Sequence, residues 1–303
     1  MGYKIPFVRD MEFVYGEPQQ MTPLIRRVVA NNPGPFTYKG TGVYIIGKGE
    51  IALIDPGPDT KEHIDVLMRA IGDEKLTHIF VTHRHMDHSP GAKPLAELTG
   101  AKIYSSTAPP KPSDCDEIRL EAGDDHGFIP DVDVQDGQRF SGPGWTIEAV
   151  ATPGHTTNHF AYALLEENVL FPGDHVMGWS TTIIGPPDGD MTAYFDSLEK
   201  ILARNYAALW PTHGPPVHEV RPFIQAYIAH RKEREEQIVA QLAAGRHRIK
   251  DIVSIIYADV DKRLHPAACH SVLAHMIRLV DLGRVICDGN PCVENEYWLK
   301  RAA

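Results

Sequence analysis

The sequence has little cysteine, no long apolar run and no excess of positive charge, and each absence excludes a class of protein. Its four cysteines form no Cys-x-x-Cys pair, so we expect reduced thiols rather than a disulfide framework. No apolar run is long enough to span a bilayer, and residues 1–13 contain no apolar segment of a secretion signal. We therefore expect a cytoplasmic protein with no membrane partner.

The charge balance argues mildly against a protein that holds long nucleic acids by charge alone. The 303 residues carry 30 Lys and Arg against 40 Asp and Glu, a formal net charge of −10. Proteins that grip a phosphate backbone electrostatically are usually basic. The chain also lacks a Gly-x-Ser-x-Gly sequence, so it shows no serine nucleophile of that type.

Short apolar runs alternate with turn residues and with helical patterns through the first two thirds of the chain. The helical patterns cover residues 59–72, 90–100 and 191–206. The predicted strands are residues 42–47, 51–57, 78–82, 101–106, 145–152, 159–166, 168–174 and 207–214. Residues 108–136 are rich in Pro, Asp and Gly, which predicts loops and edge strands. This interleaving predicts an α/β fold, a sandwich of sheets with helices outside.

The pattern changes near Val220, where helices replace the strands. Three helical patterns and a β-hairpin follow in order, at residues 223–245, 249–260, 266–283 and 284–301. Three helices and a hairpin are typical of a winged helix. We therefore predict two domains, residues 1–220 and 221–303.

Four ligand-type residues follow an apolar strand in His-x-His-x-Asp-His order, namely His83, His85, Asp87 and His88. Residues two apart at the end of a strand point to the same side, so His83 and His85 can share one ion. Asp87 and His88 continue into a loop, where a second ion can lie beside the first.

Three more ligand-type residues, His155, Asp174 and His213, stand at the ends of other predicted strands. Each is weak evidence alone, because a His or Asp beside a Gly is common in turns. Their repetition at strand ends is stronger evidence, because loops at one edge of a sheet converge. Seven ligands suit two ions that each take four or five with a water.

This set resembles the five-motif signature of the metallo-β-lactamase superfamily, with Asp55 in Leu-Ile-Asp-Pro-Gly as the first motif. The resemblance implies an αββα sandwich with a dinuclear, usually zinc, centre. It assigns His83, His85 and His155 to the first ion, and Asp87, His88 and His213 to the second. Asp174 would bridge the two ions, and Asp55 would hold the ligand loops in place.

The implied chemistry is hydrolysis by a hydroxide that bridges two cations about 3.5–4 Å apart. Asp87 would orient this hydroxide and take its proton. The His and Asp ligands suit two zinc ions, although iron and manganese tolerate them as well. His159 matches a position of the family and has two roles open, a catalytic one on the leaving group and a structural hydrogen bond.

The substrate stays open at this point. Zinc β-lactamases lack an aspartate at the position of Asp174, which is typical of branches that act on thioesters, lactones and phosphodiesters. With the winged helix, nearly the whole chain resembles the β-lactamase-like protein 2 family, which includes an endoribonuclease that cuts single-stranded RNA. The resemblance therefore implies an endoribonuclease. A thioesterase or lactonase with a small-molecule substrate is the alternative, and the acidic catalytic domain suits it equally well.

The winged helix leaves two further roles open. Residues 246–250 are locally basic and can follow a phosphate backbone, yet the third helix, residues 266–283, is mostly apolar and suits docking or a homodimer. A hypothesis of another class is a winged-helix nucleic-acid-binding protein with a structural metal. Structural zinc sites are usually four-coordinate and rich in Cys, so seven ligands without Cys count against it.

Overall fold

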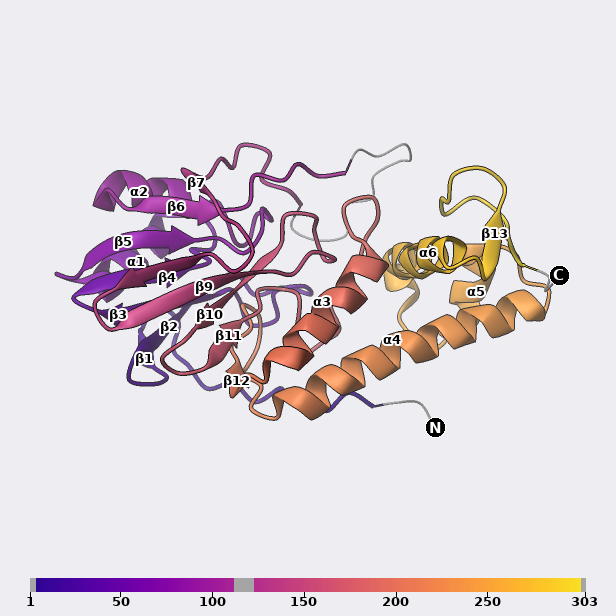
Figure 1. Cartoon of the computed structure of the whole chain (residues 1–303), viewed down its shortest axis with the longest axis horizontal. Coiled ribbons are helices and arrows are strands. Elements are labelled where there is room, and N and C mark those ends of the chain that lie inside the picture. The colour runs from indigo at the N-terminus through magenta and orange to yellow at the C-terminus, as the bar shows by residue number, and fades with distance from the viewer. Residues whose placement is uncertain (1–3, 112–122, 301–303) are drawn as a thin grey trace.

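The computed structural model describes residues 4–111 and 123–300 (Figure 1). Two β-sheets lie against each other, helices cover their outer faces, and a helical unit with a small hairpin forms the other end of the molecule. The predicted αββα sandwich with a C-terminal winged-helix unit is thereby confirmed.

The first sheet follows chain order from β1 to β7. Neighbours are antiparallel as far as β4 and parallel from β4 to β7, with α1 (Lys61–Ile71) and α2 (Ala92–Thr99) as crossovers. Thr60 caps α1, because its side chain accepts a hydrogen bond from the His63 backbone. Its strands are β1 (Gln19–Gln20), β2 (Ile25–Val29), β3 (Gly42–Lys48), β4 (Glu50–Ile54), β5 (Lys75–Phe80), β6 (Lys102–Ser105) and β7 (Val132–Asp133).

The second sheet has the order β12-β11-β10-β9-β8, with only the β11–β12 pair parallel. Helix α3 (Met191–Arg204) lies between β11 and β12 in the chain and packs on the outer face of this sheet. The strands are β8 (Arg139–Gly142), β9 (Trp145–Ala151), β10 (Phe160–Leu164), β11 (Val169–Phe171) and β12 (Ala208–Leu209).

Three apolar layers hold the sandwich together. One lies between the sheets and includes Phe80, Trp145 and Tyr162, one lies under α1 and α2, and one lies under α3. Both faces of the central strands are therefore buried, and close packing on both sides fixes the positions of the strand ends. The loops that leave those ends are positioned by rigid strands.

The C-terminal unit begins with a helix that belongs to two cores. Helix α4 packs Phe223 and Tyr227 into the layer under α3, and Ile238 and Leu242 into the core of the C-terminal unit. The domain boundary at residue 220 stays a prediction, and in the structure it falls at the first residue of α4. The elements of this part are α4 (Val220–Ala243), α5 (Ile249–Ile256), a 3-10 turn (Lys262–Leu264), α6 (His265–Asp281), β13 (Val285–Cys287) and β14 (Tyr297–Leu299).

Two parts of the structure differ from the sequence-based expectations or lie outside them. Strand β2 was not predicted, because two arginines interrupt its apolar pattern; Arg27 is nevertheless buried and donates to Gln19. Within residues 108–136, predicted as loops and edge strands, residues 112–122 with Cys115 lie outside the described residues. None of the helices in residues 4–111 and 123–300 is long and apolar enough to cross a membrane.

We expect Trp145→Ala to destabilise the sandwich by about 3–5 kcal/mol, the usual cost of deleting a large buried aromatic side chain. The indole is 1% exposed and donates from Nε1 to the Glu50 carbonyl at 2.9 Å. Urea unfolding followed by circular dichroism measures the change. Trp298→Ala, at a half-buried position in the hairpin, is the matched control, and an equal loss in both variants would contradict the prediction.

Candidate metal centre

The His-x-His-x-Asp-His segment begins two residues after β5 leaves the first sheet. A turn follows in which the backbone N–H groups of His88 and Ser89 donate to the His85 carbonyl at 3.0 and 3.1 Å. His83 and His88 are fully buried, and their ring centroids lie 4.1 Å apart. The turn thus folds the end of the segment back onto its beginning.

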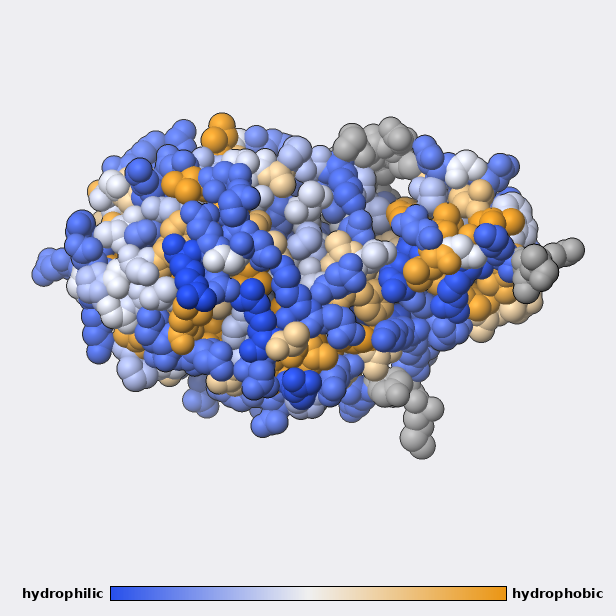
Figure 2. Space-filling model, viewed as in Figure 1, coloured by the Kyte–Doolittle hydropathy of each residue, from blue (hydrophilic) through white to orange (hydrophobic). Residues whose placement is uncertain are grey.

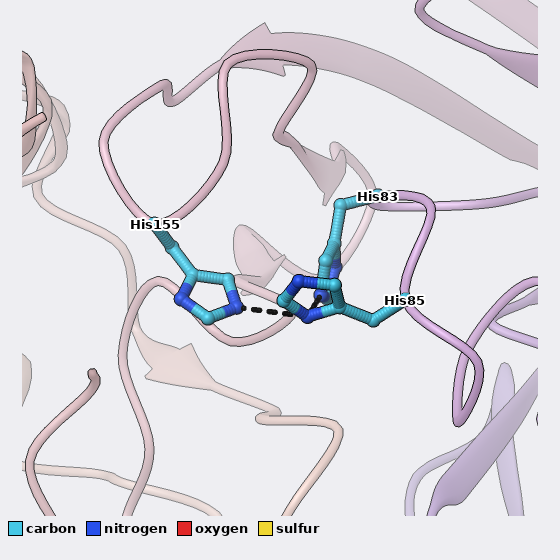
Figure 3. A group of neighbouring side chains, drawn as sticks. All are labelled: His83, His85 and His155. Atoms are coloured by element: carbon cyan, nitrogen blue, oxygen red, sulfur yellow. Dashed lines mark hydrogen bonds between the residues drawn. The ribbon is translucent and has the colours of Figure 1, made fainter. Parts of the chain in front are cut away.

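The three histidines predicted for the first ion lie together (Figure 3). His83 Nε2 is 2.9 Å from His85 Nδ1, and His85 Nδ1 is 3.3 Å from His155 Nε2. Three nitrogens bound to one tetrahedral ion at about 2.0–2.1 Å would be about 3.3 Å apart. The three rings, which come from two separate loops, therefore present their nitrogens at close to ligand spacing.

The three residues predicted for the second ion form a neighbouring group. The ligand atoms of Asp87, His88 and His213 all lie within 4.8 Å of one another. His213 Nε2 is 3.1 Å from Asp87 Oδ2, and His88 Nε2 is 3.8 Å from Asp87 Oδ1. The His213 ring comes from the loop after β12, so this group also joins distant parts of the chain.

Asp174 lies between the two groups. Its carboxylate oxygens are 3.5 Å from His88 Nε2 and 3.5 Å from His213 Nε2, and it also groups with His83 within 4.8 Å. The structure therefore brings all seven predicted ligands into one cluster in which Asp174 lies near members of both groups, and its bridging role stays a prediction.

The donor set fits a pair of metal ions. His88 Nε2, His213 Nε2 and Asp174 Oδ1 are buried and make no well-aligned hydrogen bond with the described residues. Buried polar atoms normally have a partner, and several that converge on one point fit a bound cation. Imidazole and carboxylate donors suit zinc, iron or manganese.

The electrostatics of the first group favour neutral imidazoles. Burial lowers the pKa of His83 well below its usual value, and the neighbouring His88, His85 and His155 lower it further. Burial together with His155 lowers the pKa of His85 to about 3. Neutral rings keep the lone pairs that a metal needs.

In the second group the neighbouring carboxylates favour protonated histidines instead. Burial opposes protonation of His88, but Asp174, Asp87 and Asp55 outweigh it and raise the pKa of His88. Likewise, burial raises the pKa of Asp87, and the charges of His88 and His213 outweigh it and hold that pKa low. The carboxylates and the protonated forms of the two histidines therefore stabilise one another. Divalent ions would displace those protons.

Each of four ligand histidines has its other ring nitrogen held from behind. His155 Nδ1 lies 2.8 Å from the Ile183 carbonyl and His213 Nδ1 lies 3.3 Å from the Gly40 carbonyl. His88 Nδ1 lies 2.9 Å from Asp55, and His85 Nε2 lies 3.6 Å from Asp124. Such contacts select the tautomer that points the second nitrogen at a metal.

Asp55 holds the ligand loops, as expected. Its carboxylate accepts hydrogen bonds from the Thr82 backbone at 2.8 Å and from the Thr82 and Thr212 hydroxyls at 2.9 and 2.7 Å. The residue is fully buried with φ 50°, a conformation that non-glycine residues adopt at a cost. Sequence analysis missed Thr82 and Thr212, although each directly precedes a ligand histidine.

His159 lies behind the first group rather than at its edge. It is fully buried, its Nδ1 is 2.8 Å from the Thr152 hydroxyl, and its ring centroid is 5.1 Å from that of His83. Burial and the nearby His175 keep its pKa well below the usual value. These contacts favour the structural role, and the catalytic role stays a prediction.

Comparison with known proteins identifies the family. A family model described as the metallo-beta-lactamase superfamily matches residues 39–213, the part that contains all seven ligands. The chain belongs to the metallo-β-lactamase superfamily. A second model, the beta-lactamase associated winged helix domain, matches residues 249–295. This metallo-β-lactamase superfamily protein is thus a hydrolase with a His and Asp cluster suited to metal, followed by a winged helix.

The relatives extend the likeness to most of the chain. A "Beta-lactamase-like protein 2 homolog" from Caenorhabditis elegans is 30% identical over 93% of this chain and 91% of its own length. An "Atrochrysone carboxyl ACP thioesterase" from Claviceps purpurea is 30% identical over 80% of this chain and 74% of its own. The crystal structure of a beta-lactamase domain protein from Burkholderia ambifaria has a TM-score of 0.79 at 19% identity, covering 96% of both chains. The Burkholderia ambifaria structure shares the fold of this chain.

We expect Asp55→Asn to lower the metal affinity of this superfamily member by about 10- to 100-fold, the usual effect of losing a residue that orients a ligand. The amide cannot accept all four hydrogen bonds. Chelator competition measures both dissociation constants. Asp59→Asn, at an exposed position four residues on, should bind metal like the wild type, and equal affinity in Asp55→Asn would contradict the assignment.

We also expect metal removal to lower the melting temperature. Ions that bind only the folded state, present at about 100 times their dissociation constant, stabilise it by about 2.7 kcal/mol. Calorimetry of chelator-treated and zinc-reconstituted protein measures the difference. His83→Ala should show a smaller shift, and a wild-type melting temperature indifferent to zinc would refute the metal centre.

Proposed function

We propose that this hydrolase cleaves a thioester or a related carbonyl ester of a small molecule, using two zinc ions. The observation that carries the hydrolytic part is the position of Asp174 beside both ligand groups, 3.5 Å from His88 and His213 of the second group and within 4.8 Å of His83 of the first. A shared carboxylate keeps two cations close, which is the arrangement used for metal-assisted hydrolysis. The nitrogen and carboxylate donors of the cluster are usual zinc ligands, and zinc is proposed as the usual metal of the superfamily, although iron and manganese take the same donors.

Two bound ions would supply an activated water and polarise the oxygen under attack. The residues of the chain then hold and orient the reactants. Two bound cations would keep Asp87 a carboxylate, and Asp87 retains 8% exposure, more than its buried neighbours His88 and His213. It is therefore suited to accept a hydrogen bond from the attacking water.

The preference for a small ester substrate rests on the charges of the C-terminal unit. In the basic stretch, residues 246–250, Arg248 pairs with Glu296 at 2.9 Å and Lys250 pairs with Glu294 at 2.8 Å. Cations that already face carboxylates release fewer counterions on binding a phosphate backbone. The net charge of −10 also disfavours binding to a long phosphate backbone. Similarity to a protein named as an acyl carrier protein thioesterase supports the same class.

RNA cleavage is the second candidate. It is favoured by the winged-helix match over residues 249–295 and by similarity to a β-lactamase-like protein 2 homolog along 93% of the chain. A cytoplasmic location stays a prediction.

A homodimer also stays a prediction. Figure 2 shows apolar and polar residues intermixed on one face of the C-terminal unit. Leu264 and Leu282 are exposed apolar residues of this unit.

We expect zinc-reconstituted protein to release thiol from a panel of acyl-coenzyme A and acyl-cysteamine thioesters. Asp87→Asn should reduce kcat by about 100-fold or more, because the carboxylate no longer accepts a proton. A thiol reagent measures turnover, and the exposed Asp59→Asn is the matched control.

The same preparations are tested on end-labelled single-stranded RNA. Cleavage by the wild type that is lost in Asp87→Asn, with no thioester turnover, would replace the proposal by the endoribonuclease.

A further inference from the structure

The loop between β11 and α3 supports two metal ligands from behind. It carries Asp174 itself, and its Ile183 carbonyl lies 2.8 Å from His155 Nδ1. The neighbouring Thr182 hydroxyl donates to the Asp174 carbonyl at 2.7 Å. The neighbouring residues Thr182 and Ile183 therefore contact the backbone of the bridging ligand and the ring of a ligand from the first group.

Helix α4 holds this loop with side chains one turn apart on one face. The Tyr227 hydroxyl lies 2.6 Å from the Met177 carbonyl and 2.5 Å from the Ser180 carbonyl. The Arg231 guanidinium donates to the Thr182 carbonyl. Residues four apart on a helix lie over one another, so the two side chains act on consecutive parts of the same loop.

The burial of Arg231 is unusual for a residue that only joins two units. It is 4% exposed, and none of the carboxylates in residues 4–111 and 123–300 forms an ion pair with it. A buried, unpaired charge is expensive, and its compensation here is the Thr182 carbonyl and the face of Tyr194, whose ring centroid is 5.3 Å away. The Tyr194 hydroxyl in turn donates to the His175 carbonyl at 2.8 Å, so both contacts of Arg231 lead to the same loop.

We propose that Arg231 is a positioning residue of the metal centre. By fixing the carbonyl of Thr182 it restrains two groups, the Thr182 hydroxyl that holds the backbone of Asp174 and the adjoining Ile183, whose carbonyl orients the His155 ring. The C-terminal unit, through α4, is thereby a structural part of the centre and holds one of its ligand loops. This inference is independent of the substrate and goes beyond the proposed function.

The competing explanation is that Arg231 merely joins the two units, and Arg278 provides the comparison. Arg278 on α6 donates from Nη1 to both carboxylate oxygens of Glu235 of α4 at 2.9 and 3.0 Å, and its guanidinium lies 4.4 Å from the ring centroid of Phe195 on α3. It crosses the same interface, and its hydrogen bonds and its cation–π contact with the described residues involve Glu235 and Phe195 rather than the loop. Loss of Arg278 weakens the interface alone.

The experiment compares full-length Arg231→Met and Arg278→Met with the wild type. Both zinc dissociation constants are measured by chelator competition, the cobalt-loaded proteins are compared by visible absorption, and melting temperatures are recorded. We expect Arg231→Met to weaken one of the two ions by about 10- to 100-fold and to change the cobalt spectrum. Arg278→Met should melt at a lower temperature with wild-type affinities and spectrum.

Wild-type affinities and an unchanged spectrum in Arg231→Met would overturn the proposal, whatever its melting temperature. If that variant does not fold, Arg231→Gln is measured in the same way, because its amide is too short to reach the Thr182 carbonyl. Unchanged metal binding in Arg231→Gln would overturn the proposal equally, and a selective loss would support it. Neither readout uses hydrolysis, so failure of the proposed substrate leaves the result interpretable.

Discussion

The buried carboxylate of Asp55 is the interaction on which the geometry of the metal centre depends. It accepts four hydrogen bonds, two from Thr82, one from Thr212 and one from His88. These donors belong to loops that leave β5 and β12, so one residue joins the two sheets at the edge where the ligands meet. A fully buried carboxylate is stable only with such partners. Its hydrogen bonds therefore specify the relative positions of the loops.

The ligands converge because each follows a strand whose apolar residues are buried on both sides. His83 comes after β5, His155 after β9, Asp174 after β11 and His213 after β12. The strands cannot slide without exposing the core layers, so the strand ends have fixed positions. The polar residues beyond those ends share a small volume, where carboxylates and imidazoles stabilise one another's charge. This mutual compensation makes the cluster selective for cations, because removing its protons leaves two buried carboxylates.

Sequence reasoning was strongest where chemistry and strand ends coincide. The His-x-His-x-Asp-His segment indicated a metal site because it contains four ligand-type residues within six positions and follows a buried strand. The structure places all seven expected ligands together. It was weaker where a pattern is broken by a long side chain, as in β2, where Arg27 lies buried among apolar neighbours. It could not find the contact of Arg231 with Thr182, because the two residues are far apart in the chain and a carbonyl acceptor leaves no mark in the sequence. The threonines before His83 and His213 were visible, but a hydroxyl beside a ligand is informative only once its acceptor is known.

Helix α4 changes how the two units relate. A winged helix appended by a linker would have its own core and an interface of exposed side chains, but α4 places Tyr227 in the core under α3 and Leu242 in the core of the C-terminal unit. A rigid helix shared between two cores couples their unfolding, so the sandwich and the C-terminal unit are not independent in stability. The side of α4 that faces the sandwich is also the side that carries Arg231. The packing that joins the units and the contacts that hold the ligand loop therefore arise from one helix face, and selection on either constrains the other.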